Sequence, residues 1–186
     1  MATISKKTIQ LKNGSSAVIR SAIPQDAAQL LIHAREIFAE GEFVLSTPED
    51  FRMTLEQEEA WIQDLYDDPC KLVIVAERED EIIGMLSFAN GARKRIRHLG
   101  EFSVGVTKAV RDQGIGRALI LTLLDWAHEQ PTIEKVFLEV FANNTRAIAL
   151  YTSLGFREEG RLSGRIKMAP GVYIDTLEMG QWVKQH

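Results

Sequence analysis

The chain has 186 residues, of which 45% are hydrophobic and 26% charged, and its formal net charge is -4. These values are typical of a globular protein, and no linker-like run divides the chain, so one domain over residues 1–186 is expected. The acidic balance excludes a broad basic face for nucleic acid. Every apolar run is too short to cross a membrane. The single Cys70 excludes an internal disulfide and indicates a reducing, cytoplasmic compartment.

The first half of the chain predicts a short strand, two helical segments and then an antiparallel hairpin. Apolar residues recur at helical spacing before residue 40 and again before Asp67-Asp68-Pro69, where the proline ends the helix. The loop around residues 43–51, with a short helix or turn at Thr47–Asp50, is expected near a cleft. In chain order the elements are a strand at 17–20, a helix at 24–40, a second helix ending at 67–69, and strands at 72–76 and 82–88.

The second half predicts alternating strands and helices. Gly155 followed by Phe156 is typical of a helix that ends in a Schellman motif. The expected elements are a strand at 101–107, an apolar helix at 114–129, a strand at 136–141, a helix at 144–154, and a last strand at 171–179 that pairs with one near Ile166. The order predicts an α/β (α+β) fold with a mixed central sheet and helices on both faces.

A glycine-bearing turn between the strand at 101–107 and the apolar helix predicts an anion site. The first-turn amides of a helix lack intrahelical partners, and the helix dipole favours negative charge there. Gly114 and Gly116 bring no side chain between these amides and a phosphate. The spacing matches neither a P-loop nor a dinucleotide fingerprint. By itself this turn is also compatible with a purely structural role.

Two segments around this turn resemble the GNAT superfamily of N-acetyltransferases. Arg111-Asp-Gln-Gly114-Ile-Gly116 is similar to its [RQ]-x-x-G-x-[GA] signature. Leu138-Glu-Val-Phe-Ala-Asn-Asn144-Thr-Arg-Ala-Ile-Ala-Leu-Tyr151-Thr-Ser-Leu-Gly155-Phe156 is similar to its L-x-V-x-x-x-N-x-x-A-x-x-L-Y-x-x-x-G-F pattern. The close match covers about residues 98–160. It implies that the parallel strands near 101–107 and 136–141 splay apart and admit the pantetheine of acetyl-CoA.

The resemblance also implies which residues bind the cosubstrate acetyl-CoA. The backbone of the strand at 101–107 would contact pantetheine and polarise the thioester carbonyl. The turn at Gly114 and Gly116 would hold the pyrophosphate. Asn144 would also contact pantetheine, although asparagine is in addition a favoured helix cap. Arg111 and Arg117 are expected to reach phosphate. The complete set is Val104, Val106, Arg111, Gln113, Gly114, Ile115, Gly116, Arg117 and Asn144.

Three residues are candidates for proton transfer. By resemblance Tyr151 would protonate the departing thiolate, although it could equally be a core aromatic. Glu139 lies where the Leu-Glu-Val motif resembles ribosomal-protein N-terminal acetyltransferases, whose glutamate acts as base, and Glu101 on the preceding strand is its competitor. Side chains alternate along a strand, so Glu139 lies on the face opposite Leu138. The alternative to a role as base is therefore that Glu139 is an ordinary polar residue outside the core.

The acceptor is left open as a primary amine of a small molecule, a peptide or a protein, with residues 40–55 and 161–175 expected to select it. A non-catalytic acyl-CoA-binding regulatory module is the alternative function. The basic run at residues 93–98 is expected to be a solvated loop, with contact to substrate or the 3′-phosphate as the alternative. No metal ion is expected, because the histidines lack ligand spacing. A homodimer is possible by resemblance.

Overall fold

The computed structural model describes residues 3–184, so the outermost two residues at each end of the expected 1–186 domain lie outside it. One eight-stranded sheet has the order β1-β2-β3-β4-β5-β6-β8-β7. Its strands are β1 Lys7–Gln10, β2 Ser16–Ser21, β3 Leu72–Arg78, β4 Glu81–Asn90, β5 Leu99–Val106, β6 Lys135–Phe141, β7 Arg157–Ala169 and β8 Val172–Trp182. The helices are α1 Ala27–Glu40, α2 Leu55–Asp67, α3 Ile115–Glu129 and α4 Thr145–Ser153, with short 3-10 turns η1 Pro24–Asp26 and η2 Lys108–Val110.

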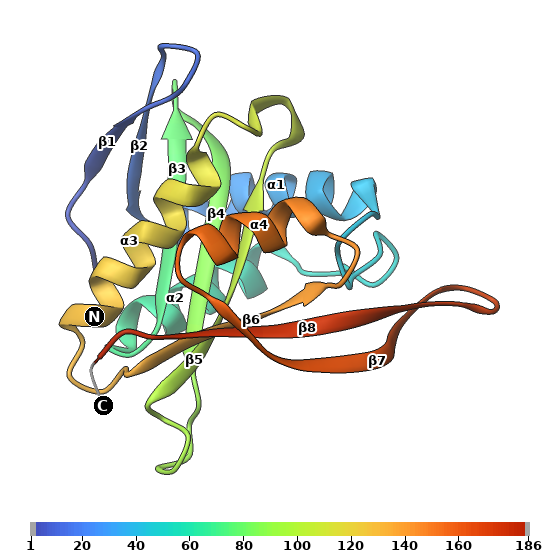
Figure 1. Ribbon diagram of the computed structural model, residues 1–186. Helices are drawn as coiled ribbons and strands as arrows, with labels where there is room; N and C mark the ends of the chain where they lie inside the picture. Colours follow the sequence, from blue (N-terminus) through green and yellow to red (C-terminus); the bar gives the residue numbers. More distant parts are fainter. Residues whose placement is uncertain (1–2, 185–186) are drawn as a thin grey trace.

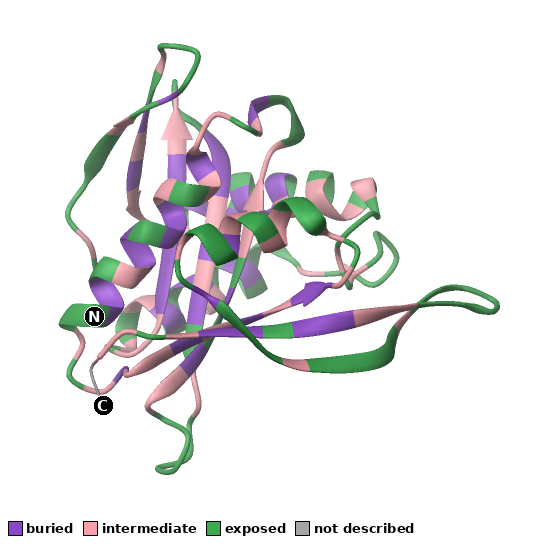
Figure 2. Ribbon diagram, in the orientation of Figure 1, coloured by how far each residue is buried: buried purple, intermediate pink, exposed green. Residues whose placement is uncertain are grey.

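The helices cover both faces of the sheet, which confirms the expected mixed α/β architecture (Figure 1). A side chain at Gly84 of β4 would meet Ile115 and Leu119, so α3 lies on that face. A side chain at Gly105 of β5 would meet His33 and Ile37 of α1, so α1 lies on the other face. Figure 2 shows buried residues concentrated where the helices meet the sheet. Within residues 3–184, no helix combines the length and apolarity that a membrane crossing requires.

One local expectation differs from the structure, and another is confirmed in one of its two forms. Strand β1 was not expected, because four residues with one half-buried side chain carry almost no periodic signal. It forms because it pairs antiparallel with β2. A short helix or a turn was expected at residues 47–50, and the structure has a turn. In this turn the Thr47 amide and hydroxyl both donate to the Asp50 carboxylate, at 3.0 and 2.9 Å.

The end of α4 confirms the expected Schellman motif. Gly155 has a φ of 97°, which a residue without a Cβ adopts at no steric cost. The Phe156 amide donates to the Tyr151 carbonyl at 3.1 Å, and the Gly155 amide donates to Thr152 at 3.0 Å. This ending turns the chain back and buries Phe156 beside Tyr151.

The parallel pairing of β5 with β6 stops partway along both strands. Leu99, Gly100 and Glu101 pair with residues 135–137. Beyond them, residues 102–106 and 138–141 continue as strand without pairing to each other. The two central strands therefore splay apart toward their carboxyl ends, as expected. On the other side of β6, strands β8 and β7 form a long hairpin that extends beyond the body of the protein (Figure 1).

Candidate active site

The turn between β5 and α3 presents unpaired backbone amides. Gly114 caps the helix with a φ of 94°. The first backbone bond of the helix runs from the Ala118 amide to the Gly114 carbonyl at 3.0 Å, so the amides of residues 115–117 precede the hydrogen-bonded ladder. A Cβ at Gly114 would meet nothing within 4 Å, and one at Gly116 would only reach van der Waals contact with Leu150 and Val106 at 3.7 and 3.8 Å. The arrangement suits a diphosphate.

The free edge of β5 supplies further amides. The Thr107 amide donates to the Ile83 carbonyl at 3.0 Å, on the β4 side. Backbone groups alternate sides along a strand, so the amides of Val104 and Val106 point toward β6. Since the pairing with β6 ends at Glu101, these two amides face the splayed region. The two amides that were expected to contact pantetheine therefore lie on the part of the β5 edge that does not pair with β6.

Gln113 anchors the turn to a distant part of the chain. Its side-chain oxygen accepts the Asn13 amide at 2.9 Å, and its backbone carbonyl accepts the Lys12 amide at 3.4 Å. The β1–β2 turn thus braces the segment that leads into α3. Because the partners are about a hundred positions apart in sequence, no local pattern could have indicated this contact.

The two arginines expected at phosphate have partners within the protein. Arg111 forms a fork with Glu40, the last residue of α1, at 2.6 and 2.7 Å, and also donates to the Val106 carbonyl at 2.9 Å. Arg117 donates to the hydroxyl of Ser153 in α4. A phosphate contact by either side chain remains a prediction, and for Arg111 it competes with the Glu40 fork.

Asn144 and Tyr151 occupy the two ends of α4. The Asn144 side chain accepts the Ala147 amide at 3.2 Å and so caps the helix, which does not exclude a cofactor contact. Tyr151 is 9% exposed and packs edge-on against Phe102 of β5, with ring centroids 6.0 Å apart. Its hydroxyl has no hydrogen-bond partner within residues 3–184, and burial raises its pKa to about 12.

The candidate bases lie together in a group of three carboxylates. Burial raises the pKa of Glu101, and the nearby charges of Glu139 and Glu178 raise it further. Glu139 stands directly opposite Glu178 on β8 and accepts the Thr176 hydroxyl at 2.6 Å. Its carboxylate also lies 3.4 Å from the Arg165 guanidinium. Sequence reasoning named Glu101 and Glu139 but not Glu178, which joins them only through sheet pairing.

The tyrosine and the carboxylates lie on opposite faces of the sheet. Phe102, which contacts Tyr151, points toward the α3 and α4 side. Its neighbour Glu101 therefore points toward the side of α1 and α2. The expected alternation at Glu139 follows the same rule, because Leu138 is buried and Glu139 only half-buried. A group held between the splayed strands would have the phenol on one side and the carboxylates on the other.

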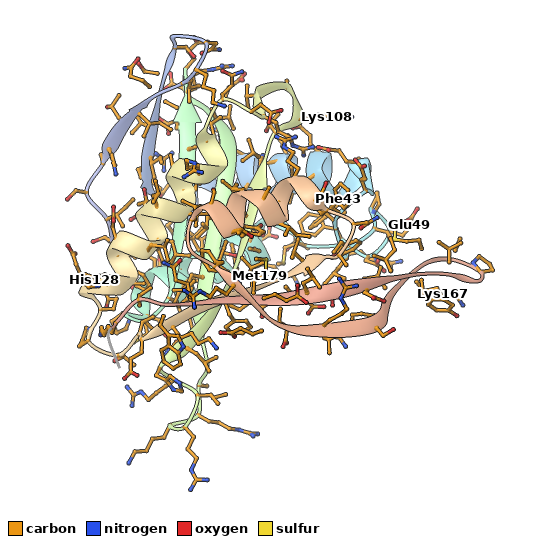
Figure 3. The ribbon with its side chains drawn as sticks, in the orientation of Figure 1. Phe43, Glu49, Lys108, His128, Lys167 and Met179 are labelled. Carbon is orange, nitrogen blue, oxygen red and sulfur yellow. The ribbon has the colours of Figure 1, made fainter. Side chains whose placement is uncertain are left out.

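The α1–α2 loop reaches the carboxylate side of the sheet. Phe43 of this loop, labelled in Figure 3, meets the buried ring of Phe141 edge-on, with centroids 6.3 Å apart. Phe141 is the last residue of β6, so the loop closes over the open end of the splayed strands. The loop, which was expected near a cleft, thus lies beside the open end of the splayed strands.

The basic loop lies at the wrong end of the sheet for a phosphate contact. It connects β4 to β5, whereas the turn expected to hold the pyrophosphate follows β5, so the eight residues of β5 separate the two by about 25 Å. Figure 3 shows the long side chains of this loop pointing away from the body. A hollow of about 440 Å³ lies between this loop and Pro131–Glu134. The solvated-loop expectation is the one that this position supports.

Comparisons with known proteins identify the family and relatives of this chain. Residues 33–156 match the model of the acetyltransferase (GNAT) family. An L-amino acid N-acetyltransferase of Escherichia coli (strain K12) is 25% identical over 90% of this chain and 98% of its own. A ribosomal-protein-alanine N-acetyltransferase of Brucella melitensis has a TM-score of 0.76 at 30% identity, covering 88% of this chain and 98% of that one.

A further solved structure, a GNAT superfamily phosphinothricin acetyltransferase of Sinorhizobium meliloti in complex with acetyl-CoA, has a TM-score of 0.77 at 21% identity. It covers 89% of this chain and 88% of that one, and it shows the fold alone. The chain described here belongs to the acetyltransferase (GNAT) family. It is an acyl-CoA N-acetyltransferase that uses acetyl-CoA as the acetyl donor.

Proposed function

We propose that this protein transfers the acetyl group by direct attack of a primary amine on acetyl-CoA, in a ternary complex without a covalent enzyme intermediate. The observation that carries the proposal is the early end of the β5–β6 ladder at Glu101 and Phe137. Beyond it, a thioester could lie between the two strands with its leaving group toward α4 and its carbonyl carbon open to the opposite face. Both reactants would then be held in line, which contributes rate through proximity.

The donor would be held mainly by the backbone. In this proposal the amides of residues 113–117 bind the pyrophosphate, with Gly114, Ile115 and Gly116 at its centre. The amides of Val104 and Val106 bind pantetheine and polarise the thioester carbonyl, where negative charge develops. Support comes from the free edge of β5 and from the unpaired first turn of α3. Asn144, at the start of α4, would contact the same arm of the cofactor.

Tyr151 would act as the acid for the departing thiolate. A thiol pKa of about 8.5 and a phenol pKa of about 12 make the transfer uphill by about 5 kcal/mol, before the apolar surroundings raise the thiol pKa as well. With the ordinary tyrosine pKa of about 10, the same transfer would cost only about 2 kcal/mol. Burial therefore makes Tyr151 a weaker acid than an exposed tyrosine. Its contribution should accordingly be modest.

Glu101 would act as the base. An alkylammonium acceptor with a pKa near 10.4 costs about 4.6 kcal/mol to deprotonate at neutral pH, so a proton acceptor is needed. Glu101 has the raised pKa of a stronger base, while Glu139 is held by Thr176 and Arg165. Glu139, the first candidate from the sequence, would then tune Glu101 and remains the alternative base. A water molecule could relay the proton.

An amine panel tests the proposed reaction. The purified protein is incubated with acetyl-CoA and with free L-amino acids, small diamines and peptides, while release of the free thiol is measured. The acceptor identity is confirmed by mass spectrometry of the product. We expect turnover with at least one of these classes and no acetylated protein residue at steady state. Tight binding of acetyl-CoA without turnover on any amine would instead favour the regulatory module.

Two further proposals concern the surroundings of the protein. The reducing cytoplasm would suit a chain whose single cysteine is half-buried and free. A homodimer would cover the edge strand β7, which is exposed along most of its length (Figure 2). Fractionation of cells that produce the tagged protein tests the first proposal. Light scattering at the concentrations used for catalysis tests the second.

A further inference from the structure

The end of α1 is tied to the beginning of the pyrophosphate turn by a partly buried ion pair. The Arg111 side chain is 27% exposed and that of Glu40 is 20% exposed. Both terminal nitrogens of Arg111 donate, one to each oxygen of Glu40. Such planar two-bond pairs are stronger and more directional than a single contact between exposed charges. The geometry therefore fixes the orientation of the guanidinium as well as its position.

The same guanidinium holds the last residue of β5. Its Nε donates to the Val106 carbonyl at 2.9 Å. Backbone N–H and C=O of one strand residue point to the same side, so this carbonyl lies at the splayed edge together with the Val106 amide. A single side chain thus links α1, the free edge of β5 and the turn that leads to Gly114.

A second contact ties the same helix to the same segment. His33 of α1 is 4% exposed, and its Nδ1 lies 3.1 Å from the Thr107 hydroxyl. Its Nε2 is buried without a hydrogen-bond partner within residues 3–184 and lies 3.5 Å from where a Cβ of Gly105 would stand. Helix α1 is therefore packed directly on residues 105–107, and Glu40 approaches Arg111 from a rigid support.

We propose that Glu40 is a positioning residue for the acetyl donor. It acts through Arg111, whose hydrogen bond to the Val106 carbonyl ties the turn to the end of β5, so that the amides of residues 113–117 face the pyrophosphate. Arg111 thereby serves the cofactor site without itself binding phosphate. This inference rests on the proposed pyrophosphate site at residues 113–117.

Loss of the Glu40 carboxylate should therefore weaken binding of the acetyl donor. Glu40→Gln keeps the shape of the side chain but removes the charge that holds the fork. We expect the dissociation constant for coenzyme A and the KM for acetyl-CoA to rise about tenfold. The value of kcat at saturating acetyl-CoA should change less than twofold, because no reacting group is removed. Coenzyme A binding is measured by calorimetry, independently of turnover.

Matched variants separate positioning from general stability. Glu36→Gln removes the same charge from the exposed side of the same helix and should leave both constants unchanged. Glu40→Asp keeps the carboxylate and should give an intermediate effect. In the double variant with Arg111→Lys, the defect should equal that of the more impaired single variant, because both changes break one linkage. Melting temperatures of all variants show whether they remain folded.

Several outcomes would overturn the inference. Equal or tighter coenzyme A binding by Glu40→Gln would mean that Arg111, once released, binds phosphate itself. If the dissociation constant of the double variant rises by the product of the two single increases, Glu40 and Arg111 act independently. A fall in kcat with unchanged coenzyme A binding would place Glu40 elsewhere in the mechanism. Wild-type protein that fails to bind coenzyme A would overturn the proposed site together with the inference, whereas the other outcomes leave that site standing.

Discussion

Tyr151 meets Phe102 edge-on across the α4–β5 interface, with ring centroids 6.0 Å apart and planes at 82°. Phe156 packs against both rings, at 5.6 and 6.1 Å. The three rings hold the phenol over the splayed end of β5 without using its hydroxyl. The ring and the hydroxyl of Tyr151 can therefore be tested separately.

Replacing Tyr151 with Phe removes the proposed acid and keeps the ring cluster. We expect kcat to fall only about tenfold, less than the roughly hundredfold or more that is typical of a general acid, because a thiolate leaves readily and burial weakens this phenol as an acid. The KM for acetyl-CoA and the melting temperature should stay close to wild type. Steady-state thiol release measures the effect, with Tyr66→Phe in α2 as control. A loss of less than a factor of two in kcat would remove Tyr151 from the mechanism.

The fall of kcat/KM at low pH, the acid limb of the pH–rate profile, should reflect protonation of Glu101. A base must be ionised, so kcat/KM falls as the pH drops below its pKa, and a raised pKa places this fall above the usual glutamate range near 4.3. Glu101→Gln should abolish most of the rate. Glu139→Gln removes a neighbouring negative charge, lowers the pKa of Glu101 and should shift the limb to lower pH with activity retained.

The reverse result would identify the other carboxylate. If Glu139→Gln loses the rate and Glu101→Gln only shifts the limb, Glu139 is the base. Glu178→Gln serves as the matched control, because it removes a third charge from the same group and should shift the limb in the same direction as Glu139→Gln. The ionisation of the acceptor is common to all variants and cancels in the comparison.

Gly114→Ala should weaken donor binding through the backbone. At a φ of 94° an added Cβ costs on the order of 1–2 kcal/mol and would tilt the amides that follow. Gly171→Ala, at a φ of 77° in the β7–β8 turn, should cost similar stability away from the site. A Cβ meets nothing within 4 Å at either position, so strain is the shared effect. Only Gly114→Ala should raise the KM for acetyl-CoA, and equal KM values for both variants would contradict the pyrophosphate assignment.

Asn144 combines a structural and a proposed binding role that substitution can divide. Asn144→Ala removes the helix cap and should cost about 1 kcal/mol of unfolding free energy. Asn144→Ser restores a capping oxygen but not the amide group. We expect thermal unfolding to recover in the serine variant while the KM for acetyl-CoA stays raised in both. Recovery of the KM together with stability would restrict Asn144 to capping.

Much of the site could be predicted because its residues are close in sequence. The Gly114–Gly116 turn and the capped α4 each depend on neighbours within a few positions, so local composition carries their signal. The opposite faces of Leu138 and Glu139 follow from strand alternation alone. By contrast, β1 was missed because four residues carry no usable periodicity, and the Glu40 partner of Arg111 was missed because 71 positions separate them.

The sequence alone determined the family, the fold class and the position of the glycine-bearing turn, since periodicity, glycine placement and helix caps are local properties of the chain. The tertiary structure decided the partners of charged groups: Glu40 for Arg111, and Glu139 and Glu178 for Glu101. The physical reason is that electrostatic interactions and burial depend on distances through space. Sheet pairing and helix packing, which join residues far apart in the chain, set those distances.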